Sequence, residues 1–335
     1  MKVFQSYPQS ENTNNPYLAQ LRARLDEADD VEIATFTWST ALLGRYDVVH
    51  LHWPEALFAA STMPRRARRD LLFALWVLRL FVTRTAIVRT VHNVGLPEGL
   101  PRHRVALLHL LDRLTTVRIR LNPVTPVPEG APVVTIPHGH YRDWLRDVPR
   151  RDTVAGRIGY VGQVRRYKNV ETLVAAFAEA STQADGLSLR VGGRPTSTGI
   201  EHAVRTAAAA VTGGEVRLDL RHLDEAELVE IVTEAELVVL PYRFMHNSGS
   251  VFYALSLERP VLVPDNEVNR ALADEVGPGW VHLFAGELDG PAVVAALDAL
   301  RATPPAAPPD LSGRHWSDSG DAHVATYRLA IGARR

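Results

Sequence analysis

The 335-residue sequence contains no cysteine, and this absence removes several kinds of chemistry at once. Without cysteine there is no disulfide framework, no thiolate nucleophile and no zinc site built on cysteine ligands. The charges also balance, because 37 Lys and Arg residues stand against 38 Asp and Glu residues. A nucleic-acid backbone is held by a net basic field, so the composition argues against nucleic acid as a partner.

Long apolar runs are absent as well. The nearest candidate is 65–84, "RRARRDLLFALWVLRLFVTR", in which an apolar run of about 13 residues is broken by Arg79. A bilayer span needs about 20 residues, so this segment does not cross a membrane. The N-terminal "MKVFQSYPQS" has no apolar signal-peptide core, and we therefore expect a cytoplasmic protein.

The same segment allows two interpretations. Leu71, Leu72, Leu75, Leu78 and Phe81 recur at helical spacing, which favours a helix whose apolar side packs on a sheet. The alternative is that its arginines contact anionic lipid headgroups, which would make the protein peripheral at the inner face of the membrane. These arginines are Arg65, Arg66, Arg68, Arg69 and Arg79.

Short apolar strands alternate with helical stretches along the whole chain, a pattern typical of α/β proteins with doubly wound parallel sheets. Domains usually run about 100–200 residues, so two are expected, over 1–145 and 155–315. A helix over 316–335, capped by Ser317 or Asp318, is expected to close the chain and to cross back to the first domain. The predicted strands are "KVFQSY", "VEIATFTW", "DVVHLHW", "AIVRTVHN", "VRIRLN", "PVVTIP", "RIGYVGQV", "LSLRVGG", "EVRLDLRHL", "LVVLPY" and "RPVLVP".

Two strand-to-helix turns in the second half are suited to a diphosphate. No G-x-G-x-x-G follows the first strand and no G-x-x-x-x-G-K-[ST] occurs, which weighs against dinucleotide oxidation and P-loop phosphoryl transfer. Instead, "GYVGQVRRYKNVETLVAAF" places three cationic residues just before a helix, and "LPYRFMHNSGSVFYALSLERPVLVP" offers backbone amides at a second helix start. Ordinary βα loops are the alternative. The candidate residues are Arg165, Arg166, Lys168, Asn247, Ser248, Gly249 and Ser250.

Polar side chains also end the strands of the first half. In "DVVHLHWPE" and "TVHN", Glu55, His52 and His92 follow buried strand positions, where ligands of parallel sheets bind. Any of the three could take a proton from a hydroxyl, although Glu55 also suits the start of a helix after Pro54. Histidine pairs 50/52 and 138/140 lack a third and fourth metal ligand, and no D-x-D pair ends a strand. We expect a hydrogen-bonded histidine cluster and no metal.

These motifs resemble those of a known protein family. "GYVGQVRRYKN", "NSGSVFYALSLERPVLVP" and the terminal "HW…Y" helix resemble sugar-nucleotide glycosyltransferases of the GT-B fold, especially the group-1 class. "NNPYLAQL", "YDVVHLHWPE", "TVHN" and "IPHGHY" are similar to a bacterial branch that builds exopolysaccharide and cell-surface glycans. The resemblance implies two Rossmann-like domains facing a central cleft, an N-terminal one for the acceptor and a C-terminal one for the nucleotide sugar.

The resemblance also implies an activity. A hexose would move, without metal or other cofactor, from a nucleotide diphosphate sugar of the GDP-mannose or UDP-glucose type to a sugar hydroxyl of a glycan or lipid-linked acceptor. Lys168 and one of Arg165 or Arg166 would neutralise the departing diphosphate, and His92 would face the donor sugar or its β-phosphate. Other residues expected in the cleft are Gly162, Gln163, His138, Tyr253 and Asn93.

The sequence departs from the group-1 pattern at three positions. Met245 and Tyr253 occupy the places where retaining members commonly carry two glutamates, and Gln163 replaces a phosphate-binding arginine. The missing sugar-side glutamate tilts the expectation toward an inverting enzyme. It also leaves two alternatives, namely a glycosyltransferase-like nucleotide-binding protein without activity and a nucleotide-sugar epimerase of the same fold.

Overall fold

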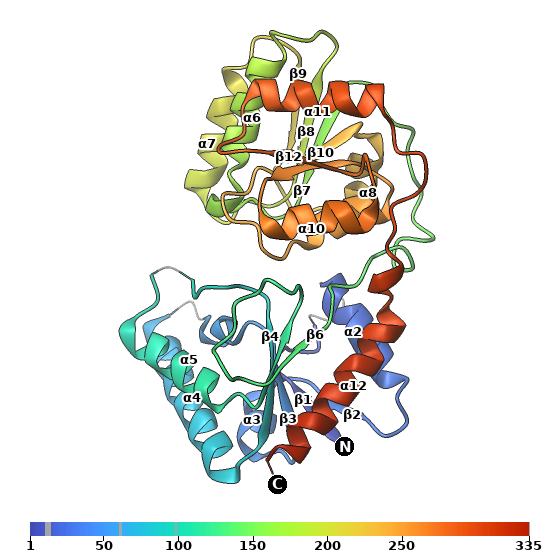
Figure 1. Cartoon of the computed structure of the whole chain (residues 1–335). Helices are drawn as coiled ribbons and strands as arrows, with labels where there is room; N and C mark the ends of the chain where they lie inside the picture. Colours follow the sequence, from blue (N-terminus) through green and yellow to red (C-terminus); the bar gives the residue numbers. More distant parts are fainter. Residues whose placement is uncertain (11–14, 60–61, 98, 335) are drawn as a thin grey trace. The chain divides into compact units, whose positions relative to one another are not determined.

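The computed structural model describes residues 1–10, 15–59, 62–97 and 99–334 (Figure 1). The chain divides into two compact units. The first unit comprises Met1–Gly139 together with Arg314–Arg335, and the second comprises His140–Gly313. The end of the chain therefore belongs to the same unit as its beginning.

The first unit is built on a parallel six-stranded sheet. Its strands are β1 (Lys2–Gln5), β2 (Glu32–Ala34), β3 (Val48–Leu51), β4 (Ala86–Val91), β5 (Val117–Arg120) and β6 (Val133–Thr135). They lie in the order β2-β1-β3-β4-β5-β6, and every pairing is parallel. In the centre, Val49 of β3 is paired with Phe4 on one side and Ile87 on the other. The carboxyl ends of β3 and β4 consequently lie next to each other at one edge.

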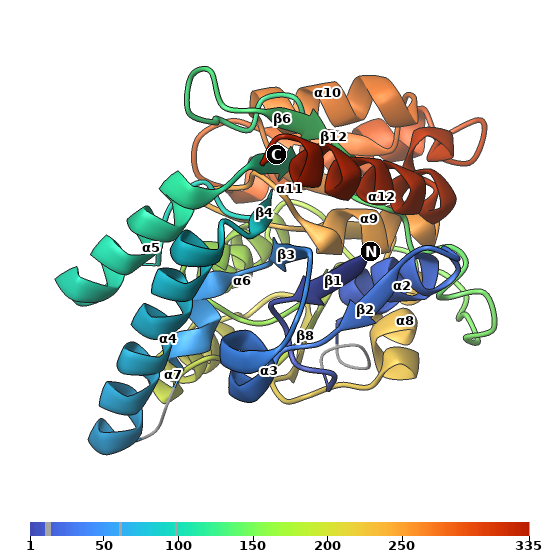
Figure 2. The same ribbon diagram turned by 90° about the horizontal axis from the view of Figure 1, so that it is seen from below.

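Helices cover both faces of this sheet, so each face has its own core (Figures 1 and 2). One core includes side chains of α2 (Pro16–Asp26) and α12 (Trp316–Gly332). The other includes side chains of α3 (Trp38–Leu43), the 3₁₀ turn η1 (Pro54–Phe58), α4 (Met63–Thr83) and α5 (Arg102–Leu114). α12 is thus a structural layer of the first unit.

The expected cap of α12 is wrong. The helix begins at Trp316, and His315 stands at the cap position without a side-chain hydrogen bond to the helix. Ser317 and Asp318 already lie in the first turn, where the Ser317 hydroxyl donates to Asp318 Oδ1 at 3.2 Å. Asp318 still favours the helix start, because a carboxylate in the first turn opposes the helix dipole.

The second unit repeats the architecture with a second parallel six-stranded sheet, in the order β12-β11-β10-β7-β8-β9. The strands are β7 (Arg157–Val161), β8 (Ser188–Gly192), β9 (Glu215–Asp219), β10 (Leu237–Val239), β11 (Val261–Pro264) and β12 (Val281–Phe284). The helical elements are η2 (Arg166–Lys168), α6 (Val170–Ala180), α7 (Thr198–Ala209), α8 (Glu225–Glu234), α9 (Gly249–Ser256), α10 (Glu267–Val276), α11 (Gly290–Ala302) and η3 (Ser312–Arg314). β12 was not foreseen, because this edge strand is short and mostly only half-buried.

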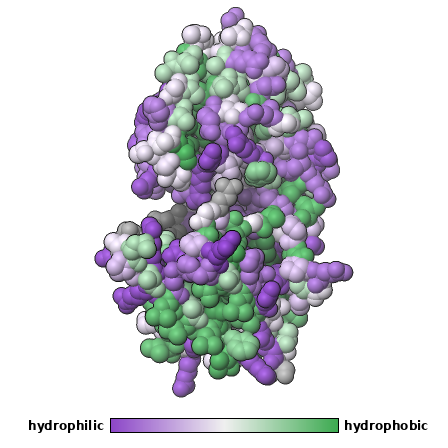
Figure 3. Space-filling view, turned by 90° about the vertical axis from the view of Figure 1, so that its left-hand side faces the viewer, coloured by the Kyte–Doolittle hydropathy of each residue, from purple (hydrophilic) through white to green (hydrophobic). Residues whose placement is uncertain are grey.

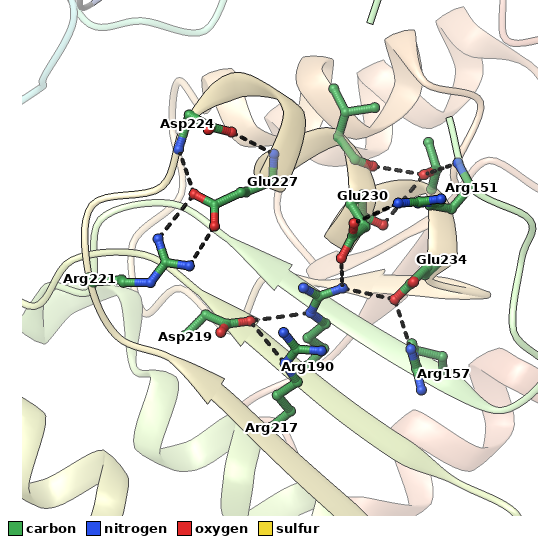
Figure 4. A network of polar contacts seen from close by, with 12 residues as sticks. Arg151, Arg157, Arg190, Arg217, Asp219, Arg221, Asp224, Glu227, Glu230 and Glu234 are labelled. Carbon is green, nitrogen blue, oxygen red and sulfur yellow. Dashed lines mark hydrogen bonds and ion pairs between the residues drawn. The ribbon is translucent and has the colours of Figure 1, made fainter. Parts of the chain in front are cut away.

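An ion-pair network joins α8 to the second sheet (Figure 4). Arg190 of β8 is 5% exposed, and its guanidinium pairs with Asp219 at 3.2 Å, Glu230 at 2.8 Å and Glu234 at 2.9 Å. A buried charge is tolerated when it is paired and hydrogen-bonded, as Arg190 is here. At the start of α8, Asp224 and Glu227 form a reciprocal capping box. The ion pairs therefore hold the second half of α8 on the sheet, and the capping box fixes its start.

The predicted packing face of α4 is wrong. Leu71, Leu75, Leu78 and Phe81 are exposed by 60%, 44%, 56% and 62%. A second set of residues at helical spacing contacts the core instead, because it carries the larger aromatic side chains. No described helix, α4 included, is long and apolar enough to cross a membrane. The buried residues of α4 are Phe73, Trp76, Val77 and Leu80.

Candidate active site

His50 of β3 is a structural residue of the first unit. Its ring is fully buried, with Nδ1 2.8 Å from the Tyr327 hydroxyl of α12 and Nε2 2.8 Å from the Thr90 hydroxyl of β4. Desolvation, reinforced by the neighbouring histidines, holds the pKa of His50 well below its usual value. A neutral ring with both nitrogens hydrogen-bonded joins three elements and offers nothing to a metal ion or a substrate.

His52 and His92 form a pair at the adjacent ends of β3 and β4. His52 Nδ1 lies 3.0 Å from His92 Nε2, although the two residues are 40 positions apart in sequence. His52 is 2% exposed, whereas His92 is half-buried and its ring stacks on Trp53 at a centroid distance of 3.8 Å. Desolvation is the main cause that lowers the pKa of both rings well below the ordinary histidine value. Both histidines are therefore neutral at neutral pH, and His92 is the one that reaches the surface of the unit.

Tyr17 of α2 brings a third predicted histidine to this pair. Its ring centroid lies 6.2 Å from that of His52, 5.2 Å from that of His92 and 5.0 Å from that of His138. Burial lowers the pKa of His138 to about 4, partly offset by the hydrogen bond between its Nδ1 and the Gly139 carbonyl. Tyr17 was not singled out from the sequence, although its position after Asn15 and Pro16 marks a helix start.

Glu55 lies in the first turn of η1, two positions after Trp53. Its side chain is half-buried and makes no hydrogen bond or ion pair to any described residue. Its carboxylate thus stays available after β3, at the same edge of the sheet at which His92 follows β4. A carboxylate in a first turn also favours the helix start, so the geometry is compatible with both roles considered for Glu55. Asn93 follows His92 at the end of β4 and is exposed.

In the second unit, Gly162, Lys168 and Ser250 converge at the carboxyl end of β7. A Cβ atom on Gly162 would lie 2.9 Å from Lys168 Nζ and 3.1 Å from Ser250 Oγ. Lys168 Nζ also lies 4.8 Å from the centroid of the Tyr242 ring, and the Tyr242 hydroxyl donates to Ser250 Oγ at 3.3 Å. An ammonium and a hydroxyl around a residue without a side chain are the groups that bind a phosphate.

The three cationic residues of the predicted loop are placed differently. The Arg165 guanidinium donates to Gln163 Oε1 at 2.6 and 3.0 Å, and both side chains are exposed. Arg166 is exposed in η2, whereas Lys168 is half-buried beside Gly162. Asn247 and Ser248 immediately precede α9, which starts at Gly249 without a side-chain cap, so its first amides are not bound by Ser248.

Glu225 is a further candidate site residue, which the sequence analysis did not single out. Its Oε1 accepts a 2.5 Å hydrogen bond from the Tyr253 hydroxyl, and its Oε2 accepts a 2.6 Å hydrogen bond from Trp144 Nε1. Tyr253 thus orients the Glu225 carboxylate from a neighbouring helix. Met245, at the other position compared with the group-1 pattern, is buried and its Sδ lies 3.3 Å from Asn269 Nδ2. The only sequence signal for Glu225 was its place at a helix start after a strand.

The described residues contain no group of three or more His, Asp or Glu side chains that could hold a metal ion. His138 belongs to the first unit and His140 to the second. His140 Nδ1 accepts a 3.3 Å hydrogen bond from the backbone amide of Arg142. Each of these two histidines is thus engaged within its own unit.

Two Rossmann-like units, each built on a parallel sheet and the second with a cationic turn at a helix start, define the GT-B class. Solved structures of this class resemble the chain over nearly its whole length. AviGT4, a glycosyltransferase involved in avilamycin A biosynthesis, matches with a TM-score of 0.58 and 14% identity over 99% of this chain and 98% of that chain. HepE of Anabaena in complex with UDP matches with a TM-score of 0.57 and 13% identity over 99% and 98%. UDP-GlcNAc 2-epimerase from Neisseria meningitidis matches with a TM-score of 0.60 and 12% identity over 98% and 100%.

Sequence comparison separates a transferase from an epimerase of the same fold. No protein-family model matches the chain. Two GDP-mannose:glycolipid 4-beta-D-mannosyltransferases of Xanthomonas campestris pv. campestris are each 42% identical over 330 residues, which cover 98% of this chain and 92% of theirs. The chain belongs to the same family of bacterial glycosyltransferases. It is an enzyme that transfers a hexose from a nucleotide diphosphate sugar to a sugar hydroxyl, which confirms the predicted class and activity.

Proposed function

We propose that this enzyme transfers mannose from GDP-mannose to the 4-hydroxyl of a membrane glycolipid, with inversion to a β-linkage. The names of its relatives, 42% identical over 98% of the chain, support this choice of donor, acceptor and linkage. Inversion also agrees with buried Met245, which stands where retaining members of the group-1 class commonly carry a glutamate. The enzyme would act as a peripheral protein at the cytoplasmic face of the membrane, where a glycolipid presents its sugars.

The main support for a donor-binding site in the second unit is that Lys168 Nζ and Ser250 Oγ both lie beside Gly162. In the proposal, the ammonium and the hydroxyl bind the GDP diphosphate, and the first amides of α9 assist them. Glu225, oriented by Tyr253 and Trp144, accepts hydrogen bonds from the ribose hydroxyls, because a carboxylate accepts more than one hydrogen bond per oxygen.

The acceptor site is proposed for the first unit, with Glu55 as the general base. Glu55 removes the proton from the acceptor hydroxyl, the acceptor oxygen attacks the anomeric carbon, and the bond from that carbon to the β-phosphate oxygen breaks. The electron pair leaves with GDP, whose added negative charge is stabilised by Lys168. No metal is required in this scheme, because the cationic turn supplies the positive charge.

The three predicted catalytic residues are not equivalent in this proposal. His52 is buried and hydrogen-bonded to His92, so it orients the His92 ring and does not reach an acceptor. His92 is held by His52 and by the stacked Trp53 ring, which suits a fixed polar contact to the donor sugar or its phosphate. Glu55 has no such restraint among the described residues and is the better base.

Two measurements test the donor and the linkage. Thermal denaturation with GDP, UDP or ADP should show the largest rise in melting temperature with GDP, because a ligand of the native state stabilises by mass action. The product of GDP-mannose and a short-chain glycolipid acceptor should show a β-anomeric signal by NMR. Preferential stabilisation by UDP, or an α-linked product, would refute the proposed donor or stereochemistry.

Substitution of Glu55 tests the base. Glu55→Gln keeps the shape of the side chain but removes the basic carboxylate, so the transfer rate should fall by about 100-fold or more with GDP binding retained. Glu129→Gln, at an exposed turn of the same unit, is the matched control and should leave the rate unchanged. If Glu55→Gln transfers mannose at the wild-type rate, Glu55 serves only the helix start and His92 becomes the candidate base.

A further inference from the structure

α4 carries an exposed apolar stripe on the side opposite its core contacts. Leu71, Leu75, Leu78 and Val82 are spaced four, three and four residues apart, which places them in one line along a helix. They are exposed by 60%, 44%, 56% and 69%. Of the sixteen large hydrophobic side chains exposed in the described chain, six lie on α4. Exposed apolar side chains so gathered mark an interaction surface.

The stripe continues onto the neighbouring helix. α5 packs against α4, and both lie on the same side of the first sheet (Figures 1 and 2). Leu110 of α5 is 44% exposed. Figure 3, which faces these helices, shows hydrophobic atoms gathered over them in the lower part of the view. At about 1.5 Å per residue, the stripe on α4 alone is about 16 Å long.

Exposed arginine side chains lie on the same two helices as the apolar stripe. Arg65 and Arg68 are exposed in the first turns of α4, and Arg113 is exposed on α5. Arg69 and Arg79 are engaged in the fold, the first with the Leu57 carbonyl and the second with the Ala41 carbonyl. The single acidic residue of α4, Asp70, pairs with Arg104 of α5 at 2.8 Å. The outer side of α4 is therefore both apolar and basic.

We propose that the outer face of α4 and α5 docks on an anionic phospholipid bilayer. In this arrangement the exposed apolar stripe enters the headgroup region, and Arg65 and Arg68 contact lipid phosphates. An amphipathic helix that lies in the membrane interface has this combination of an apolar line and flanking arginines. The inference extends the proposed function, because a glycolipid acceptor would then be presented at the surface to which the enzyme binds.

Vesicle flotation tests the proposal without donor or acceptor, so its outcome is independent of mannosyl transfer. The wild-type chain should float with vesicles of phosphatidylcholine and phosphatidylglycerol in equal parts, and less with phosphatidylcholine alone. Combined Leu71→Gln, Leu75→Gln and Leu78→Gln substitutions should lower the affinity at least about tenfold, because less apolar surface enters the lipid. Glutamine is a good helix former, so α4 should remain folded.

Charge and position controls complete the experiment. Arg68→Gln should weaken binding to the mixed vesicles about fivefold and leave phosphatidylcholine binding unchanged. Leu75→Gln should lower vesicle binding, whereas Leu329→Gln, at a site 52% exposed on α12, should not. With a water-soluble acceptor analogue, the triple variant should keep the wild-type rate.

Three results would overturn the inference. The first is a wild-type chain that does not float, and the second is a triple variant that floats like the wild type. The third is a wild-type dimer by light scattering that the triple variant converts to a monomer, because the stripe would then bind a second copy of the chain.

Discussion

Acidification should destabilise the first unit through its desolvated histidines. Five histidines of this unit have a pKa below the ordinary value, and burial is the largest cause in each case. Their unfolded-state pKa is near 6.5, so protons bind the unfolded chain first as the pH falls. The stabilisation is complete above about pH 6.5 and is lost as the pH falls from there toward the folded-state pKa. The five are His50, His52, His92, His138 and His323.

The magnitude follows from the two histidines whose folded-state pKa is about 4, His138 and His323. Each lowers the free energy of unfolding by about 1.2 kcal/mol between about pH 7 and about pH 5.5, so the pair accounts for about 2.4 kcal/mol. The other three act in the same direction. Domains are typically stable by only about 5–15 kcal/mol, so the loss is a large fraction of the total.

Amide hydrogen exchange with mass spectrometry measures this effect separately in each unit. Peptides from β3 and α12 should exchange much faster at the lower pH, after correction for the intrinsic pH dependence of exchange. Peptides from β7 and β8 should change less, because the second-unit histidines whose pKa is lowered by burial, His246 and His282, are only half-buried. Both sets of peptides come from the same sample, so the comparison needs no second protein.

A variant isolates the contribution of one histidine. His323 Nδ1 lies 2.6 Å from the Ser319 carbonyl and its buried Nε2 has no partner in the described chain, so His323→Phe removes a titrating group and leaves no new unpaired atom. The pH dependence of stability in the first unit should become shallower by at most about 1.4 kcal/mol per pH unit, between about pH 6.5 and pH 4. His109→Phe, at an exposed site on α5, should leave it unchanged. Stability that does not vary with pH in this range would refute the argument.

Three further predictions concern the donor site. Lys168→Ala should weaken GDP binding by about 10- to 100-fold in calorimetry, because a charge-assisted contact contributes about 1.5–3 kcal/mol, and Arg165→Ala should cost less because that side chain is bonded to Gln163. Equal losses in the two variants would contradict this assignment. Gly162→Ala should lower both the melting temperature and GDP affinity, since φ is +134° and the new methyl would lie 2.9 Å from Lys168 Nζ, whereas Gly199→Ala, with open space around it, should do neither. Transfer should continue in excess EDTA, and loss of activity that magnesium or manganese restores would show that the charge of the cationic turn is not sufficient.

Local patterns in the sequence determined the architecture. The alternation of apolar strands and helices predicted two doubly wound sheets, because strand and helix periods are properties of neighbouring residues. The position of Lys168 before a helix start likewise followed from the order of residues. The unforeseen edge strand β12 had too few buried positions to stand out. The place of a turn residue can be predicted from the sequence when the strand before it and the helix after it are both recognisable.

Only the tertiary structure decided which of two possible contacts each side chain makes. α4 has two apolar stripes of equal periodicity, and the fold buries the one with Phe73 and Trp76 because it fits the core. The pairing of His52 with His92, and of Glu225 with Tyr253, joins residues 40 and 28 positions apart. Contacts of this kind depend on strand order and helix placement, which bring distant residues together and leave no periodic trace in the sequence.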